Sequence, residues 1–175
     1  MEALKPDLQA LQLALKMERD GRQFFLDASD KASHPLTKET FDSLAAWELE
    51  HIEIIERFQS SLRDTGQWES VAPLQTKKEE AIETFKTVFQ EAREHIDEAV
   101  KAETGDLEAY RMARDMEDKI SVFYQKQAGE SSDENARAFY TFMADQEREH
   151  YQILDNALQY LEDPAQWFEQ GEWLF

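Results

Sequence analysis

The feature that most constrains the fold is an internal repeat in which ionisable residues recur on apolar helical stripes. Three ionisable pairs are each separated by 99 positions: Glu18 and Glu117, Glu48 and Glu147, and His51 and His150. Several apolar residues match at the same offset, whereas most other aligned positions differ. An accidental likeness between helices would keep apolar residues and vary charged ones. The repeat therefore predicts two related helix pairs, which together form an all-α four-helix bundle with pseudo-two-fold symmetry.

Apolar residues that recur at three- and four-residue steps predict where the helices lie. The four helices span about residues 7–32, 36–63, 106–129 and 134–161. The connector, residues 67–104, is too long for a hairpin loop and contains a further helical run from Lys77 to about Val100. The second and third helices are therefore expected to run in the same direction, on either side of one long crossover.

The C-terminal tail is short and aromatic. We expect residues 1–163 to form the bundle and residues 164–175 to form this tail. Trp167, Phe168, Trp173, Leu174 and Phe175 all fall within it. So much aromatic surface is unfavourable in water, so the tail is predicted to pack on its own bundle or on a partner subunit.

Composition excludes several classes of protein. The chain has no cysteine, which excludes disulfides, thiolate catalysis and a cysteine-held iron centre. A formal net charge of -19 opposes binding to nucleic acid or to an anionic membrane, although the solubility of acidic helices accounts for most of it. The sequence shows no apolar signal core and no stretch of about 18 apolar residues. We therefore expect a cytoplasmic protein with neither nucleic-acid nor membrane partners.

Four glutamates are predicted to lie on the core-facing stripes, one on each helix. A buried, unpaired carboxylate is costly, so four such residues need a compensating charge. The two Glu-x-x-His pairs, Glu48 with His51 and Glu147 with His150, each place both side chains on one helix face. Unrelated surface glutamates are the alternative, but two such pairs in register with two further core-facing glutamates argue against it. Four carboxylates balance two divalent metals, as in di-iron and di-manganese carboxylate bundles.

The repeat divides the predicted metal ligands into two equivalent sets. In each half, one glutamate (Glu48 or Glu147) is expected to bridge both metals. A second glutamate (Glu18 or Glu117) is expected to bind one metal from the side, and the histidine to bind one metal through a ring nitrogen. Hard oxygen donors with imidazole suit iron or manganese, and a mixed iron–zinc pair is a further alternative. Six ligands leave open positions that a small oxidant could occupy.

A tyrosine follows one of these glutamates on the same helix face. Tyr124 lies seven residues after Glu117, so it either donates a hydrogen bond to a ligand carboxylate or forms part of the core. Its repeat partner is Phe25, which predicts unequal surroundings for the two halves of the site.

The remaining histidines and one further matched pair are expected to lie at the surface. His34 stands beside a proline, and His95 lies in an acidic run, so we expect both to be solvated. Glu50 and Glu149 match each other in the repeat but lie off the inner stripes. None of these four is predicted to bind metal.

At this point the sequence resembles the rubrerythrin branch of the ferritin-like superfamily. The resemblance rests on residues 144–150 and 47–51, and on a Met-Glu pair that precedes Phe24-Phe25 and again Phe123-Tyr124. It extends from about Leu8 to Leu161. It implies a ferritin-like bundle and a di-iron protein that reduces hydrogen peroxide, or reacts with dioxygen, using electrons from a redox partner. The six residues of the repeat are the implied ligands.

The sequence departs from full-length rubrerythrins in three respects. It lacks their cysteine-ligated rubredoxin module, so a separate rubredoxin-like donor would have to supply electrons. It lacks their additional carboxylate on the third helix, because Arg114 and Ile120 occupy the inner positions on either side of Glu117. It also has Phe25 where a tyrosine is often found.

A homodimer or a larger homo-oligomer is expected.

Three functions are compatible with these residues. The first is a di-iron oxidoreductase of the peroxidase type, which is the function favoured by the resemblance. The second is a ferroxidase or an iron store, which for storage needs a closed shell. The third is a non-enzymatic helical module in which the metals only stabilise the bundle.

Overall fold

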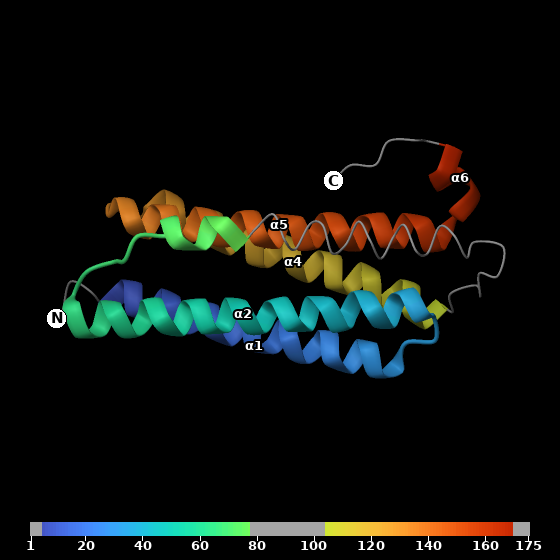
Figure 1. Cartoon of the computed structure of the whole chain (residues 1–175), viewed down its shortest axis with the longest axis horizontal. Coiled ribbons are helices and arrows are strands. Elements are labelled where there is room, and N and C mark those ends of the chain that lie inside the picture. Colours follow the sequence, from blue (N-terminus) through green and yellow to red (C-terminus); the bar gives the residue numbers. More distant parts are fainter. Residues whose placement is uncertain (1–4, 78–103, 170–175) are drawn as a thin grey trace.

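Four long helices, in two antiparallel pairs, make up most of the part of the chain that the structure describes (Figure 1). The computed structural model describes residues 5–77 and 104–169. Helix α1 (Lys5–Lys31) packs along α2 (Pro35–Thr65), and α4 (Thr104–Glu130) packs along α5 (Glu134–Glu162). Helices α2 and α4 run in the same direction, as do α1 and α5. The described residues contain no strand, so the predicted all-α four-helix bundle is confirmed.

Local sequence signals explain where the helices begin and end. The Asp133 carboxylate caps α5 by accepting hydrogen bonds from the backbone N–H groups of Asn135 and Ala136. Helix α2 begins with Pro35 at its first position, and Gly66 caps its C-terminal end with a φ of 73°, in the left-handed region that favours glycine. Each of the four long helices begins and ends within two residues of the predicted bounds.

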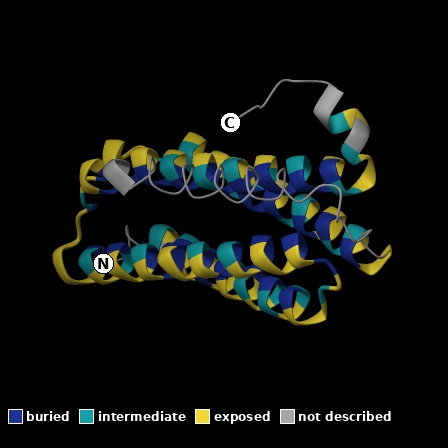
Figure 2. Cartoon of the chain, turned by 45° about the vertical axis from the view of Figure 1, so that its right-hand side comes forward, coloured by how far each residue is buried: buried dark blue, intermediate teal, exposed yellow. Residues whose placement is uncertain are grey.

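The apolar core consists of two clusters, one on either side of the six ionisable residues of the repeat. Along α2, residues 36–45 belong to one cluster and residues 52–62 to the other, with Glu48 and His51 between them. The other three helices show the same division. Figure 2 shows that the buried residues lie on the faces that the helices turn toward one another. The bundle therefore encloses its ionisable residues between two apolar layers.

The connector and the tail are described only in part. A short 3-10 helix, η2 (Ala72–Lys77), follows α2, whereas most of the predicted helical run from Lys77 to Val100 lies outside the described residues. After α5, the chain forms α6 (Pro164–Glu169), and the Trp167 ring meets Tyr160 edge to face at 5.5 Å between centroids. No helix in the described part of the chain is long and apolar enough to cross a membrane.

The expectation that His34 is solvated is wrong. Its side chain is buried, and its Nδ1 accepts a hydrogen bond of 3.1 Å from the backbone N–H of Leu36. It therefore serves as the N-cap of α2. The backbone N–H groups of Ser33 and His34 both donate to the Asp106 carboxylate, which ties the α1–α2 turn to the start of α4. His95 lies outside the described residues.

Candidate metal centre

The six ionisable residues of the repeat form one buried group, which we call the Glu–His cluster. The four glutamates are 0% exposed and the two histidines are 3% exposed. Its members are Glu18 on α1, Glu48 and His51 on α2, Glu117 on α4, and Glu147 and His150 on α5. The structure thus brings together every residue that the sequence predicts as a ligand.

On one side of the cluster, His51 faces three carboxylates. Its Nδ1 lies 3.0 Å from Glu147 Oε1, 3.5 Å from Glu18 Oε2 and 3.7 Å from Glu48 Oε2. Three different helices supply these oxygens. Because Glu48 lies one turn before His51 on α2, the helical spacing itself brings that pair together.

On the other side, His150 repeats the arrangement. Its Nδ1 lies 3.1 Å from Glu48 Oε1, 3.5 Å from Glu147 Oε2 and 3.7 Å from Glu117 Oε1. Glu48 and Glu147 therefore each face both histidines, with one carboxylate oxygen toward His51 and the other toward His150. Glu117 approaches only one histidine. This is the division into two central and two lateral carboxylates that the repeat predicts.

The cluster leaves many buried polar atoms without a partner. Both oxygens of Glu48, Glu117 and Glu147, Oε2 of Glu18, and Nδ1 of both histidines lack a hydrogen-bond partner in the described part of the chain. Buried polar atoms are rarely left in this state. Candidate ligand atoms of the four central residues, from Glu48, His51, Glu147 and His150, lie within 4.8 Å of one another. The residues present therefore fit a site for two metal ions.

The metal-free cluster shares protons among its carboxyl groups. Burial, followed by the charges of Glu147 and Glu48, raises the pKa of Glu18 and Glu117 well above the usual range. Burial also opposes ionisation of Glu48 and Glu147. For these two, however, contacts with the histidines and the protonated glutamates prevail, lowering the pKa of Glu48 to about 2 and that of Glu147 well below its usual range.

The two cluster histidines complete this charge balance. Burial favours their neutral forms, but the facing carboxylates raise the pKa of both imidazoles well above the usual range. Without metal, these pKa shifts favour imidazolium forms of both histidines, carboxylate forms of Glu48 and Glu147, and neutral forms of Glu18 and Glu117. Two divalent cations would replace these protons against four carboxylates, and the charge would again be balanced.

Tyr124 distinguishes the two halves of the site. Its hydroxyl donates a short hydrogen bond to Glu18 Oε1, which decides between the two predicted roles of this residue. The equivalent position in the repeat is Phe25, which has no hydroxyl, and both oxygens of Glu117 lack a hydrogen-bond partner in the described residues. Only one of the two lateral carboxylates is therefore oriented by a tyrosine.

The residues at the family's additional carboxylate position do not join the cluster. Arg114 Nη1 pairs with Asp155 Oδ1 at 2.7 Å, and both side chains are about 30% exposed. Ile120 is buried in the apolar core. Glu50 is exposed and Glu149 is half-buried, so both lie outside the Glu–His cluster.

Sequence reasoning missed an aromatic stack beside the cluster. The Trp47 indole stacks on His150 at 5.4 Å between centroids and 14° between planes. His150 in turn stacks on His51 at 5.1 Å and 15°. The repeat partner of Trp47 is Gln146, so this indole supports only one of the two histidines. The mismatch between Trp47 and Gln146 in the repeat is the signal that could have revealed it.

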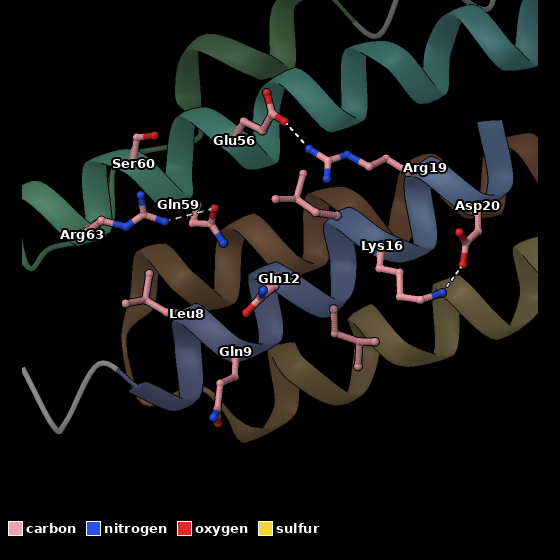
Figure 3. Close-up of a pocket in the computed structure, with 12 residues that line it drawn as sticks. Leu8, Gln9, Gln12, Lys16, Arg19, Asp20, Glu56, Gln59, Ser60 and Arg63 are labelled. Carbon is pink, nitrogen blue, oxygen red and sulfur yellow. Dashed lines mark hydrogen bonds and ion pairs between the residues drawn. The ribbon is translucent and has the colours of Figure 1, made fainter. Parts of the chain in front are cut away.

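A groove on the outside of the bundle is distinct from the cluster. It runs between α1 and α2, has a volume of about 950 Å³ and is lined by residues that include Leu8, Gln12 and Arg63 (Figure 3). Across it, the Arg19 guanidinium pairs with Glu56 at 2.6 Å. No residue of the Glu–His cluster lines this groove.

Comparison with known proteins agrees with the site. A sequence model of the rubrerythrin family matches residues 9–158, which include all six cluster residues. No significant match is found among curated proteins or among solved structures. The matched region covers most of the chain and extends through all four long helices. The chain therefore belongs to the rubrerythrin family.

Proposed function

We propose that this chain is a di-iron protein that reduces hydrogen peroxide, or reacts with dioxygen, with electrons from a separate redox protein. The observation that carries the proposal is the convergence of four carboxylates and two imidazoles on one buried point, with most of their polar atoms unpaired. Family membership supports the same reading. Iron is favoured because hard oxygen donors with imidazole suit it.

The cluster residues would have distinct roles in holding two iron ions. Glu48 and Glu147, which face both histidines, would bridge the two ions. Glu18 with His51, and Glu117 with His150, would complete one ion each. When bound, the metals supply reversible electron transfer to a small oxidant at their open positions.

The rest of the bundle would control access and orientation. Apolar layers on both sides of the cluster exclude bulk water, which strengthens the electrostatic interactions within it. Tyr124 fixes the orientation of Glu18 through its hydrogen bond, and Trp47 fixes the plane of His150. These contacts would hold the ligands in place while the charge of the centre changes.

Reduction of one peroxide to two waters consumes two electrons and two protons. The chain has no cysteine with which to hold an iron–sulfur or rubredoxin-type centre of its own. The proposal therefore includes an external one-electron donor of the rubredoxin type. It also includes a homodimer or a larger homo-oligomer in the cytoplasm.

The direct test mixes anaerobic, Fe²⁺-loaded protein with hydrogen peroxide in a stopped-flow spectrometer. We expect rapid oxidation of the bound iron and, after a rubredoxin-type donor is added, return to the reduced state. Glu48→Ala is expected to abolish the rapid phase, whereas Glu50→Ala, which changes an exposed glutamate two residues away, should retain it. Equal rates for wild type and Glu48→Ala would contradict the proposal.

Two outcomes would point to the other functions. Oxidation of many Fe²⁺ ions per chain by dioxygen, in an assembly with the mass of a closed shell, would favour iron storage. Binding of zinc alone after growth with added iron, with no spectral response to peroxide, would favour a structural role for the metals.

A further inference from the structure

A line of oxidisable aromatic side chains leads away from the Glu–His cluster. It begins at Tyr124, whose hydroxyl is bound to Glu18. The Tyr124 and Tyr140 rings lie 6.3 Å apart between centroids, and the Tyr140 and Trp68 rings lie 5.4 Å apart. Successive rings are close enough for one-electron transfer between them. The line therefore connects the candidate metal centre to the loop that follows α2.

Packing alone does not explain the hydroxyl of Tyr140. The side chain is 1% exposed, and the hydroxyl lacks a hydrogen-bond partner in the described residues. A buried hydroxyl without a partner is unfavourable, and phenylalanine would fill the same space without this cost. The other half of the molecule has phenylalanine at both equivalent positions, since Phe25 and Phe41 are the repeat partners of Tyr124 and Tyr140.

The geometry of the two aromatic pairs is nevertheless alike. The Phe25 and Phe41 rings lie 5.9 Å apart between centroids, close to the 6.3 Å between the two tyrosines. The two halves thus place rings in matching positions on matching helices, but only the α4–α5 half carries phenols. Tyrosine gives up an electron far more readily than phenylalanine does, so only this half could conduct an oxidising equivalent.

The outer end of the line has a proton acceptor beside it. Trp68 is 7% exposed, and its backbone carbonyl accepts a hydrogen bond of 3.2 Å from Asn135 Nδ2, which holds the loop against α5. Asp7, a half-buried carboxylate on α1, affects the pKa of Tyr140 by its charge, and its own pKa is affected by Trp68. The Trp68 indole N–H and the Tyr140 hydroxyl form no hydrogen bond within the described residues, so this carboxylate is the acceptor we assign to both. Burial raises the pKa of Asp7, and the contact with Trp68 lowers it.

We propose that Tyr124, Tyr140 and Trp68 form a one-electron relay that carries an oxidising equivalent from the metal centre to the edge of the bundle. The inference rests on the proposed function. The reduction of one hydrogen peroxide needs two electrons, and the relay would supply the second of them when the metal centre can supply only one, as when a single Fe²⁺ ion is bound. The relay would protect the buried ligands from oxidation by moving the oxidising radical away from them to Trp68.

The steps balance in electrons and protons. Tyr124 gives one electron to the oxidant at the centre and its phenolic proton to Glu18. Tyr140 then reduces the Tyr124 radical, which takes back the proton from Glu18, while the proton of Tyr140 passes to Asp7. Trp68 reduces the Tyr140 radical, which recovers its proton from Asp7, and the Trp68 indole proton passes to Asp7. A small reductant of the thiol or ascorbate class restores Trp68 by returning one electron, with the proton from Asp7.

The test uses full-length protein loaded with one Fe²⁺ ion per chain, so that the metal supplies only one of the two electrons, mixed with hydrogen peroxide in the absence of a donor and frozen within milliseconds. Electron paramagnetic resonance on protein with ring-deuterated tryptophan is expected to show a tryptophan radical. Mass spectrometry is expected to find oxygen added at Trp68. Tyr140→Phe should lose both signals, and Trp68→Phe should shift the radical from tryptophan to tyrosine.

A tyrosine in the opposite apolar layer supplies the matched control. Tyr110 lies on α4 and is 0% exposed, but it belongs to the core cluster on the other side of the Glu–His cluster, where its ring contacts Phe41 at 4.9 Å between centroids. Tyr110→Phe should therefore leave both Trp68 signals unchanged. Circular dichroism and iron content confirm that each variant is folded and loaded.

The possible outcomes separate the relay from the proposed function. Iron that is oxidised by peroxide with no protein radical, or with Trp68 signals unchanged in Tyr140→Phe, would overturn the relay alone. Iron that does not react with peroxide at all would overturn both.

Discussion

The α1–α2 pair and the α4–α5 pair contribute the same ionisable side chains but surround them differently. Each pair gives a lateral glutamate, a central glutamate and a histidine, with matching distances on the two sides. The aromatic neighbours do not match: Tyr124 and Tyr140 stand in one half, where Phe25 and Phe41 stand in the other. Binding two similar ions requires equivalent ligands, whereas the packing around them is free to diverge. The ligands are therefore shared by the two halves, and the differences between the halves lie in the side chains that contact those ligands.

The largest expected effect comes from removing one of the central carboxylates. Glu48→Ala and Glu147→Ala should each reduce the metal content from about two ions per chain to one or fewer, because either glutamate would bridge both ions. Elemental analysis of iron-loaded protein measures this directly, with Glu50→Ala as the exposed control. If one substitution removes the metals and the other leaves them in place, the equivalence of the two halves is wrong.

The next effect distinguishes the lateral carboxylates. Tyr124→Phe removes the hydrogen bond to Glu18, and loss of such an orienting contact typically weakens metal binding roughly 10- to 100-fold. The converse change, Phe25→Tyr, offers a hydroxyl near Glu117 and should strengthen binding of one ion. Competition with a chromophoric chelator gives the affinities of both ions. Unchanged affinities in Tyr124→Phe would show that the hydrogen bond does not orient the ligand.

Changes in pH should affect both halves equally. In the metal-free protein the pKa values of Glu18, Glu117 and both cluster histidines are raised, so protons occupy these groups until metal displaces them. Each displaced proton makes binding about tenfold tighter per unit rise in pH, up to the raised pKa. The folding stability of the metal-free protein should change in the opposite direction, falling as the pH rises. Stabilisation from the raised pKa values is present at low pH and is lost as the pH rises above the unfolded values.

The measurement is the melting temperature from pH 5 to 8, with and without metal. The stabilisation by metal should grow as the pH rises, because tighter binding to the folded state raises the melting temperature. Parallel melting curves across this range would mean that no protons are displaced from the Glu–His cluster.

The smallest expected effect concerns stability alone. Tyr140→Phe removes a buried hydroxyl that lacks a partner in the described residues, and should raise the free energy of unfolding by about 1 kcal/mol. Phe41→Tyr, at the equivalent position, buries a hydroxyl and should lower it by about 1–3 kcal/mol. Urea denaturation of the metal-free proteins measures both. Clear destabilisation by Tyr140→Phe would reveal a hydrogen bond to the hydroxyl and weaken the case for a redox role.

Much of the fold could be predicted because it depends on periodicity and helix-end signals. Gly66 and Asp133 mark helix ends by local chemistry, and the 99-residue offset relates the two helix pairs. The same offset identified all six residues that the structure brings together. Whether they bind metal stays a prediction, as do the electron donor, the oxidant and the oligomer.

The features that could not be predicted from the sequence depend on how side chains from different helices contact one another. The stacking of Trp47 on His150 and the line from Tyr124 to Trp68 arise from rotamers and interhelical distances, which periodicity does not contain. His34 was expected in solvent because it stands beside a proline, but its Nδ1 caps α2. For Trp68, at the outer end of the line of aromatic rings, a sequence signal did exist, because Trp68 and Trp167 are separated by the same 99 positions as the cluster residues.

The central claim is that two related halves form one site for two metal ions. A crystal structure of the iron-loaded protein, with anomalous diffraction measured at the iron edge, tests this most directly. We expect two neighbouring peaks between Glu48 and Glu147, one contacted by His51 and Glu18 and the other by His150 and Glu117. A single peak, or iron bound only by surface carboxylates while the Glu–His cluster remains protonated, would contradict the claim.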